Sequence, residues 1–138
     1  MRLLSLAACL CLFSALISAQ NLSLQCHQAL VPGCSIGAMV HAPMPNDARV
    51  SVVLAFQPGS TPVMINSQLI NLPLSGPMAI VGKGKMRNGV WHGEVRIPNH
   101  PSIVGLDTYF AGVIESASVG TIATFNVPFG PILEDAIQ

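Results

Sequence analysis

Histidine and carboxylate side chains are the groups in this chain that could bind a metal ion or transfer protons. His92 and Glu94 lie two positions apart in a segment where apolar and polar residues alternate. Residues i and i+2 of a strand share a face, so both side chains could bind one metal ion. A catalytic zinc needs a third protein ligand, which His41 could supply from another strand. Because nothing in the sequence requires that ligand, we predict a solvated outer face holding His92, Glu94 and Arg96.

The serine and acidic residues lack the arrangements that hydrolases use. Ser116 and Ser118 stand in Glu-Ser-Ala-Ser-Val-Gly, which is not the Gly-x-Ser-x-Gly turn of a hydrolase nucleophile. The acidic residues show no pair placed for glycoside hydrolysis. His100, which lies between an asparagine and a proline, is expected in a turn. We therefore predict no catalytic, metal-binding or cofactor-binding residues and no cofactor, with a metal-dependent enzyme as the least favoured alternative.

Cys26 and Cys34 are the two cysteines that remain once the N-terminal segment described below is removed. Seven residues separate them, including the turn-forming Pro32-Gly33. An even pair of cysteines in an exported chain is typical of a disulfide. Closing so short a loop would stabilise the fold by about 2.5 kcal/mol in the chain-entropy treatment. A metal pair or a redox thiol fits less well because the spacing is not Cys-x-x-Cys. We predict a structural disulfide.

The first 19 residues have the layout of a secretory signal peptide. Arg2 precedes an uncharged apolar run over residues 3–17, which ends on the small residues Ser18 and Ala19. Two alternatives remain open. A retained anchor would need about 20 apolar residues to span a bilayer, more than this run offers. Lipidation at Cys9, after Leu-Ala-Ala, would leave most of the apolar run beyond the cut. We predict cleavage after Ala19, secretion to the periplasm or cell exterior, and no membrane span in the mature chain.

Charged residues are scarce. The chain has 6 Lys+Arg and 6 Asp+Glu, so 9% of its residues are charged, against about 25% in a typical soluble domain. Nucleic-acid binding requires a basic surface, so we expect no nucleic-acid partner. The one basic cluster, Lys83, Lys85 and Arg87, lies among glycines beside Asn88-Gly89. We predict a solvated hairpin tip here and no phosphate or heparin site.

Apolar and polar residues alternate with a period of two along most of the remaining chain, and no window shows a helical period. The Asn88-Gly89 pair predicts a tight hairpin turn. We predict an all-β fold, an antiparallel Ig-like β-sandwich of seven or eight strands over residues 20–130, followed by a flexible tail over 131–138. The expected strands are Ile36–His41, Arg49–Phe56, Val63–Ile65, Gln68–Leu72, Met78–Gly82, Val90–Ile97, Thr108–Glu115 and Thr121–Val127.

The second half of the chain contains Ile97-Pro-Asn-His-Pro, a loop ending in Gly105-Leu106 and a strand containing Tyr109-Phe110. In these features it resembles a family of uncharacterised exported β-sandwich proteins of planctomycete-type bacteria. Those proteins usually have Gln after Tyr-Phe, where this chain has Ala111. The resemblance implies a secreted β-sandwich. It implies no site residues, because that family has no agreed activity.

Two classes of function follow from these features. The first is a structural or adhesive module of the cell envelope or extracellular space, which would bind an unknown envelope or extracellular protein or glycan. The second is a ligand-binding sandwich of the carbohydrate type, which would need exposed aromatic rings. The chain has one Trp and one Tyr. Trp91 lies on the apolar side of its expected strand with Val95 and Ile97, which predicts core packing, so we favour the first class.

Overall fold

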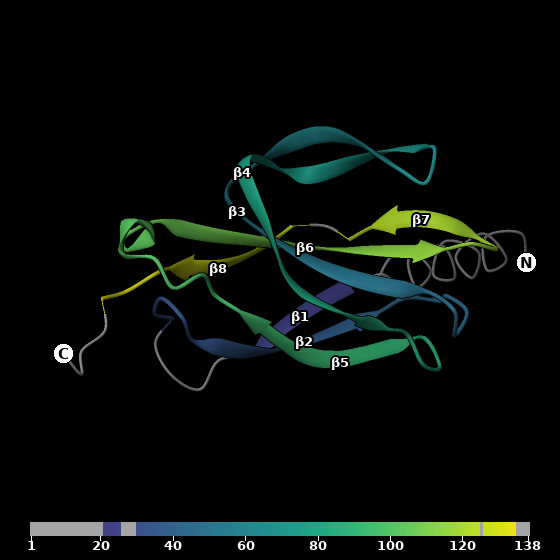
Figure 1. The fold of residues 1–138 in the computed structure, drawn as a ribbon, viewed down its shortest axis with the longest axis horizontal. Helices are drawn as coiled ribbons and strands as arrows, with labels where there is room; N and C mark the ends of the chain where they lie inside the picture. Colours follow the sequence, from purple (N-terminus) through teal and green to yellow (C-terminus); the bar gives the residue numbers. More distant parts are fainter. Residues whose placement is uncertain (1–20, 26–29, 125, 135–138) are drawn as a thin grey trace, which may run out of the picture.

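Eight antiparallel strands form two sheets in the computed structural model, which describes residues 21–25, 30–124 and 126–134. The smaller sheet has the order β1-β2-β5 and the larger one β4-β3-β6-β7, with β8 pairing the other half of β6 (Figure 1). A short 3-10 helix, Pro101–Ile103, precedes β6. The predicted all-β sandwich is confirmed. The strands are β1 (Asn21–Gln25), β2 (Ser35–His41), β3 (Arg49–Ile65), β4 (Gln68–Lys85), β5 (Val90–Arg96), β6 (Asp107–Ser116), β7 (Gly120–Ala123) and β8 (Val127–Pro131).

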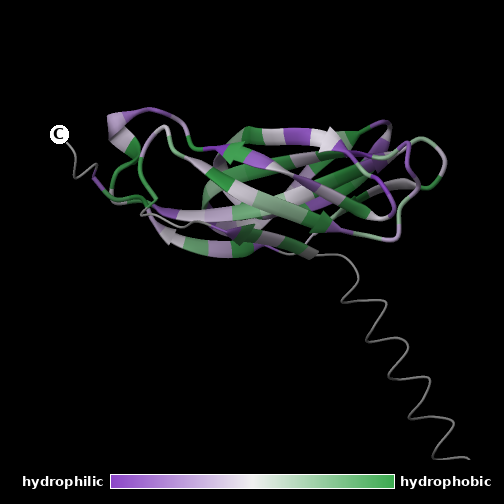
Figure 2. Cartoon of the chain, turned by 90° about the horizontal axis from the view of Figure 1, so that it is seen from below, coloured by the Kyte–Doolittle hydropathy of each residue, from purple (hydrophilic) through white to green (hydrophobic). Residues whose placement is uncertain are grey.

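The two sheets pack face to face around one hydrophobic core. Buried and exposed residues alternate along β2, so that Ile36, Ala38 and Val40 point inward while their neighbours face solvent. The same alternation of hydrophobic and hydrophilic residues is visible along the strands in Figure 2. Phe110 and Ile114 of β6 meet this layer from the larger sheet. Period-two patterning in the sequence thus becomes one buried face for each sheet.

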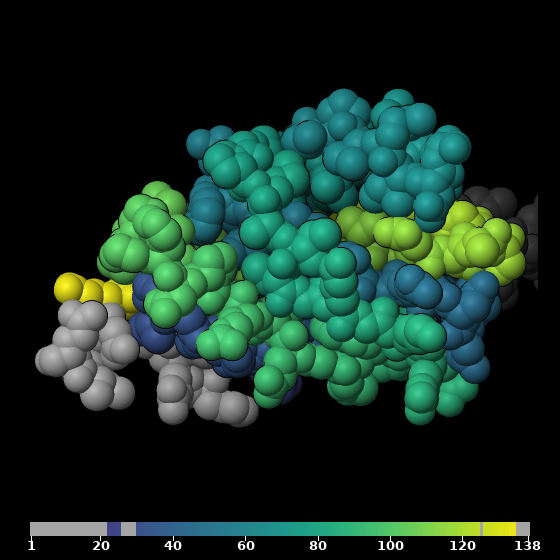
Figure 3. Space-filling view, viewed as in Figure 1, coloured from purple at the N-terminus to yellow at the C-terminus, as the bar shows by residue number. Residues whose placement is uncertain are grey.

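β3 and β4 continue past the sandwich as a long two-stranded ribbon. Beyond Ala55, β3 pairs with β4 alone, and the register shifts at Ala55/Gln57 and again at Pro58/Thr61. Such irregularities bend a strand. We call the outer part of the ribbon, residues 57–75, the arm. It lies along the outer face of the larger sheet, where β4 contacts β6 and β7 (Figure 3).

The underside of the arm forms a second hydrophobic cluster with the outer face of the larger sheet. Leu72 and Leu74 of the arm are buried with Val53, Ala111 and Val113 of the sheet. The larger sheet is therefore covered on both faces along part of its length. This explains why β3 and β6 each contain an unbroken run of buried residues where a half-exposed strand would alternate.

Hydrogen bonds attach the tip of the arm to the β6–β7 hairpin. The side-chain amide of Gln68 donates to the carbonyl oxygen of Thr121 at 3.0 Å and accepts from the Thr121 N–H, also at 3.0 Å. The Asn66 amide donates to Glu115 Oε2 at 3.1 Å. Nearer the base of the arm, Asn126 donates to the carbonyl oxygen of Pro73. Gln68 thus satisfies backbone groups of the edge strand β7 that a further strand would otherwise bind.

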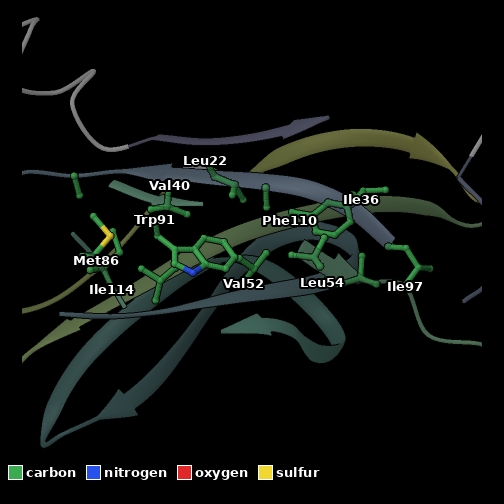
Figure 4. Packing of buried hydrophobic residues seen from close by; sticks show 14 of the residues in the cluster. Leu22, Ile36, Val40, Val52, Leu54, Met86, Trp91, Ile97, Phe110 and Ile114 are labelled. Atoms are coloured by element: carbon green, nitrogen blue, oxygen red, sulfur yellow. The ribbon is translucent and has the colours of Figure 1, made fainter. Parts of the chain in front are cut away.

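Trp91 fills the space between the sheets where β4 and β5 lie next to each other. Its indole packs over Gly93 of its own strand and against Gly84 of β4, and a Cβ at either position would overlap the ring. At Gly82, a Cβ would lie 3.2 Å from the Glu94 carbonyl oxygen and 2.8 Å from Val95 Cγ1. We call these three glycines the glycine slot. Figure 4 shows the indole lying among Val40, Val52 and Ile114.

Several sequence predictions change in detail. The short strands expected at Val63–Ile65 and Gln68–Leu72 are parts of β3 and β4. Pro62 and Pro73, expected to break them, lie within the ribbon. Each arm strand has a partner on one side only, and strands at an edge are where a sheet tolerates proline. The turn at Asn88-Gly89 is confirmed, with φ of 53° and 75°.

Both ends of the domain also differ from expectation. β1 was not predicted, and the strand expected over Thr121–Val127 divides into β7 and β8, which pair different halves of β6. The ordered domain extends beyond residue 130, because Ile132 is fully buried and its N–H bonds to the Leu106 carbonyl oxygen. The flexible tail predicted from residue 131 is therefore wrong at its start, and residues 135–138 lie outside the described residues.

The predicted signal peptide, residues 1–19, also lies outside the described residues, as does Cys26. Cys34 is half-buried. Because its expected partner is not described, the disulfide stays a prediction. Within the described ranges, no helix is long and apolar enough to cross a bilayer.

Replacing Gly84 by alanine should lower the free energy of unfolding by about 1–3 kcal/mol, the usual cost of overfilling a core. The new methyl group would displace the buried indole of Trp91. Gly37→Ala is the matched control in β2, since its Cβ would meet only the Gln25 carbonyl oxygen at 3.7 Å. Urea unfolding followed by circular dichroism measures both variants. Equal stability of the two would show that the glycine slot does not limit the approach of the sheets.

Replacing Gln68 by alanine should loosen the arm while leaving the sandwich folded. The change removes two hydrogen bonds to Thr121, which together contribute about 1–2 kcal/mol. Hydrogen exchange at the Thr121 amide should therefore accelerate by roughly 5-fold to 30-fold. Gln57→Ala, at an exposed glutamine near the base of the arm, is the control. Unchanged protection of Thr121 in the Gln68 variant would contradict this role.

Candidate functional site

The residues with metal-binding potential lie on the outer face of the smaller sheet. His92, Glu94 and Arg96 are all exposed there, which confirms the predicted solvated face. Met39 lies directly opposite His92, and His41 is opposite Val90. Among the described residues, no group of three or more His, Cys, Asp and Glu side chains is placed to hold a metal ion. The structure therefore does not bring His41 together with His92 and Glu94 as a ligand set.

A shallow depression on the same face lies over Gly37, which contributes no side chain. Ser23, Gln25, Met39 and His92 surround a volume of about 210 Å³. Polar and apolar side chains both line it, and it is open to solvent. This depression lacks the deeply buried surface that would hold a ligand firmly.

The other candidate nucleophile and base residues serve local structure. His100 precedes the 3-10 helix, as the predicted turn requires, and its Nδ1 accepts from the Ser102 N–H and lies 2.6 Å from Ser102 Oγ. Both residues are exposed. Ser116 is buried, and its Oγ accepts from the N–H groups of Ser118 and Val119 in the β6–β7 turn. These contacts cap a helix and a turn.

The basic cluster lies in a different place from the one predicted. All three of its cations are exposed, but Lys83 and Lys85 belong to strand β4, and only Arg87 flanks the hairpin turn. Lys85 lies opposite Arg49 in β3, and Arg49 in turn lies opposite Glu115 in β6. Like charges directly opposite each other in a sheet are unfavourable. This row of charges crosses the outer face of the larger sheet.

An apolar groove of about 360 Å³ opens between the arm and that outer face. One wall comes from the underside of the arm and the other from the sheet. We call this feature the apolar groove. Its main apolar side chains are Val63, Ile65 and Leu72 from the arm, and Val53, Ile80 and Val113 from the sheet. Ile80 is 57% exposed, so a large apolar side chain stands at the opening of the groove.

A second, polar groove of about 650 Å³ adjoins the first at Glu115, which lines both. Asp47, just before β3, and Arg49, its first residue, line this groove together with Asn66 and Gln68 from the arm tip. The hydrogen bonds that attach the arm to the β6–β7 hairpin therefore also close one side of this polar groove. The two grooves thus adjoin each other on the outer face of the larger sheet, beside the arm.

Sequence reasoning did not find this site, although part of its signal is present. Val63, Ile65 and Leu72 alternate with polar or exposed residues, which indicated strands. What the pattern could not show is that these strands fold back over their own sheet. The arm tip turns through Asn66 and Ser67, with φ of 51° and 62°, and this pair lacks the glycine that usually marks a two-residue hairpin.

No protein-family model matches the chain, and a search of curated proteins gave no match either. The resemblance to exported planctomycete-type proteins therefore stays a prediction. The roles of the residues above rest on the geometry of this structure alone.

Proposed function

We propose that this chain is an exported, non-catalytic β-sandwich module that acts by adhesion to a protein of the cell envelope or extracellular space. The observation that carries this proposal is the outer surface of the arm. Met64 and Leu69 lie directly opposite each other in the β3–β4 pairing, and their side chains are 66% and 65% exposed. Exposed apolar side chains grouped on one surface are typical of protein interaction sites.

The shape of the arm favours contact through this face rather than through its strand edges. Pro58 and Pro62 lie in its β3 strand and Pro73 in its β4 strand. A proline on an edge strand lacks the N–H that a further strand would bind, and so blocks edge pairing. Val119, which is 65% exposed, adds a third apolar side chain in the β6–β7 turn to which the arm tip is attached.

The carbohydrate-binding alternative loses its main aromatic candidate. Trp91 is buried in the glycine slot, where its faces are covered by core residues. Tyr109 is half-buried and packs against the second hydrophobic cluster. Sugar-binding surfaces of the stacking type need an exposed ring face. The adhesive hypothesis is therefore the one that the arrangement of side chains supports.

Tryptophan fluorescence tests the burial on which this choice depends. Trp91 is the single tryptophan of the chain, so its emission needs no deconvolution. We expect a blue-shifted emission maximum and little quenching by iodide, because the indole is enclosed between the sheets. A red-shifted emission that iodide quenches readily would reinstate Trp91 as a carbohydrate-stacking residue.

Adhesion itself can be tested by co-sedimentation of the purified protein with the envelope and matrix fraction of the producing cells. The double variant Met64→Ser/Leu69→Ser should bind at least tenfold more weakly, since two buried apolar contacts are lost. Its folding should be unaffected because both side chains are exposed.

The matched control is Val104→Ser/Leu106→Ser, which removes two exposed apolar side chains near the 3-10 helix. We expect this variant to sediment like the unmodified protein. If the two double variants lost binding equally, or if neither did, the arm would not be the adhesive surface.

A further inference from the structure

The apolar groove changes in polarity along its length. On the outer face of β4, the residues run from Met78 and Ile80, which line the groove, to Lys83 and Lys85. Along β3, the order is Val53, Ser51 and then Arg49, which lies opposite Lys85. One end of the groove is thus apolar, the other is lined by Ser51 and Glu115, and the exposed cations lie just beyond that polar end.

The strand pairing places the cations next to residues that line the groove. Ser51, which lines the groove, lies opposite both Lys83 of β4 and Val113 of β6. The next row of the sheet holds Lys85, Arg49 and Glu115. An anion bound beside Lys83 and Arg49 would therefore stand within one strand spacing of the groove.

We propose that this groove binds a free single-chain acyl carboxylate, with its hydrocarbon chain between the arm and the sheet and its carboxylate beside Lys83 and Arg49. The groove volume of about 360 Å³ lies within the range of small-molecule sites, which are concave and mostly apolar with a few polar groups at fixed points. A bound chain would also cover Ile80, which the protein leaves 57% exposed.

The charges around the head-group position favour an anion. Three cations, Arg49, Lys83 and Lys85, lie near two carboxylates. Glu115 lies opposite Arg49 and lines the groove, and Asp47 lines the adjoining polar groove together with Arg49. Glu115 accepts a hydrogen bond from Asn66 at the arm tip. A ligand carboxylate would relieve the repulsion between Arg49 and Lys85, which lie directly opposite each other. The guanidinium can also bind a carboxylate through two parallel hydrogen bonds.

The site goes beyond the proposed adhesive function and does not depend on it. Adhesion is assigned to Met64 and Leu69 on the outer side of the arm, whereas the groove uses its underside. Variants of one surface leave the other intact. Each proposal can therefore fail without affecting the other.

A chain-length series tests the proposal. Saturated carboxylates of increasing length are titrated into the purified protein below their micelle concentrations, and calorimetry measures each Kd. We expect affinity to rise about twofold to fourfold per methylene until the groove is filled, as burial of hydrocarbon predicts. Methyl groups of Val53, Val63 and Val113 should show the largest NMR shift changes. Affinity that does not depend on chain length, or shift changes centred on Gly37, would overturn the proposal.

Two variants test separately the contacts of the ligand's carboxylate and those of its hydrocarbon chain. Arg49→Gln/Lys83→Gln should weaken carboxylate binding by about fivefold, as expected for two exposed ion pairs, and leave binding of the matching n-alcohols unchanged. Ile80→Ser should weaken binding of both ligand types. Arg87→Gln and Leu106→Ser, outside the groove, are the respective controls. Equal affinity for carboxylates and alcohols, or equal effects of the variants and their controls, would refute the site.

Discussion

The contact between the indole of Trp91 and three glycines sets how closely the two sheets approach at one edge of the sandwich. Gly82 and Gly84 of β4 and Gly93 of β5 leave room for the ring, and side chains at these positions would collide with it or with β5. β4 is thereby held against the smaller sheet while it also pairs with β3. Everything beyond this edge depends on that anchor, because β4 leaves the sandwich from there as one strand of the arm.

The arm converts an ordinary two-sheet fold into one with three layers over part of its length. Register shifts bend the ribbon, and a second cluster around Leu72 and Leu74 holds it against the sheet. The two hydrogen bonds between Gln68 and Thr121 then fix the tip. As a result, the arm has an exposed apolar surface on one side and a groove on the other. Both functional proposals follow from this single fold-back.

The sequence predicted the sandwich well, because alternation along strands such as β2 and the Asn88-Gly89 turn are local signals. It predicted the arm poorly. Pro62 and Pro73 read as strand ends, yet a two-stranded ribbon tolerates prolines on its free edges. β8 beyond Val127 was missed because its packing depends on a distant partner: the rings of Phe129 and Phe110 pack edge to face, with their centroids 6.0 Å apart. The sequence shows which residue types line the two grooves but not that the grooves exist, because their walls come from segments that meet only in the tertiary structure.

The sequence by itself determined the strand pattern, the low charge, the burial of Trp91 and the solvated face at His92. Each of these depends on neighbours along one strand, where a period of two suffices. The tertiary structure alone decided that residues 57–75 fold back on their own sheet and that Lys83 lies beside an apolar groove. These features depend on bulges and on contacts such as Gln68 with Thr121, 53 residues apart in the chain. No local sequence pattern predicts a contact between residues so far apart in the chain, because such contacts are determined by how distant segments pack together.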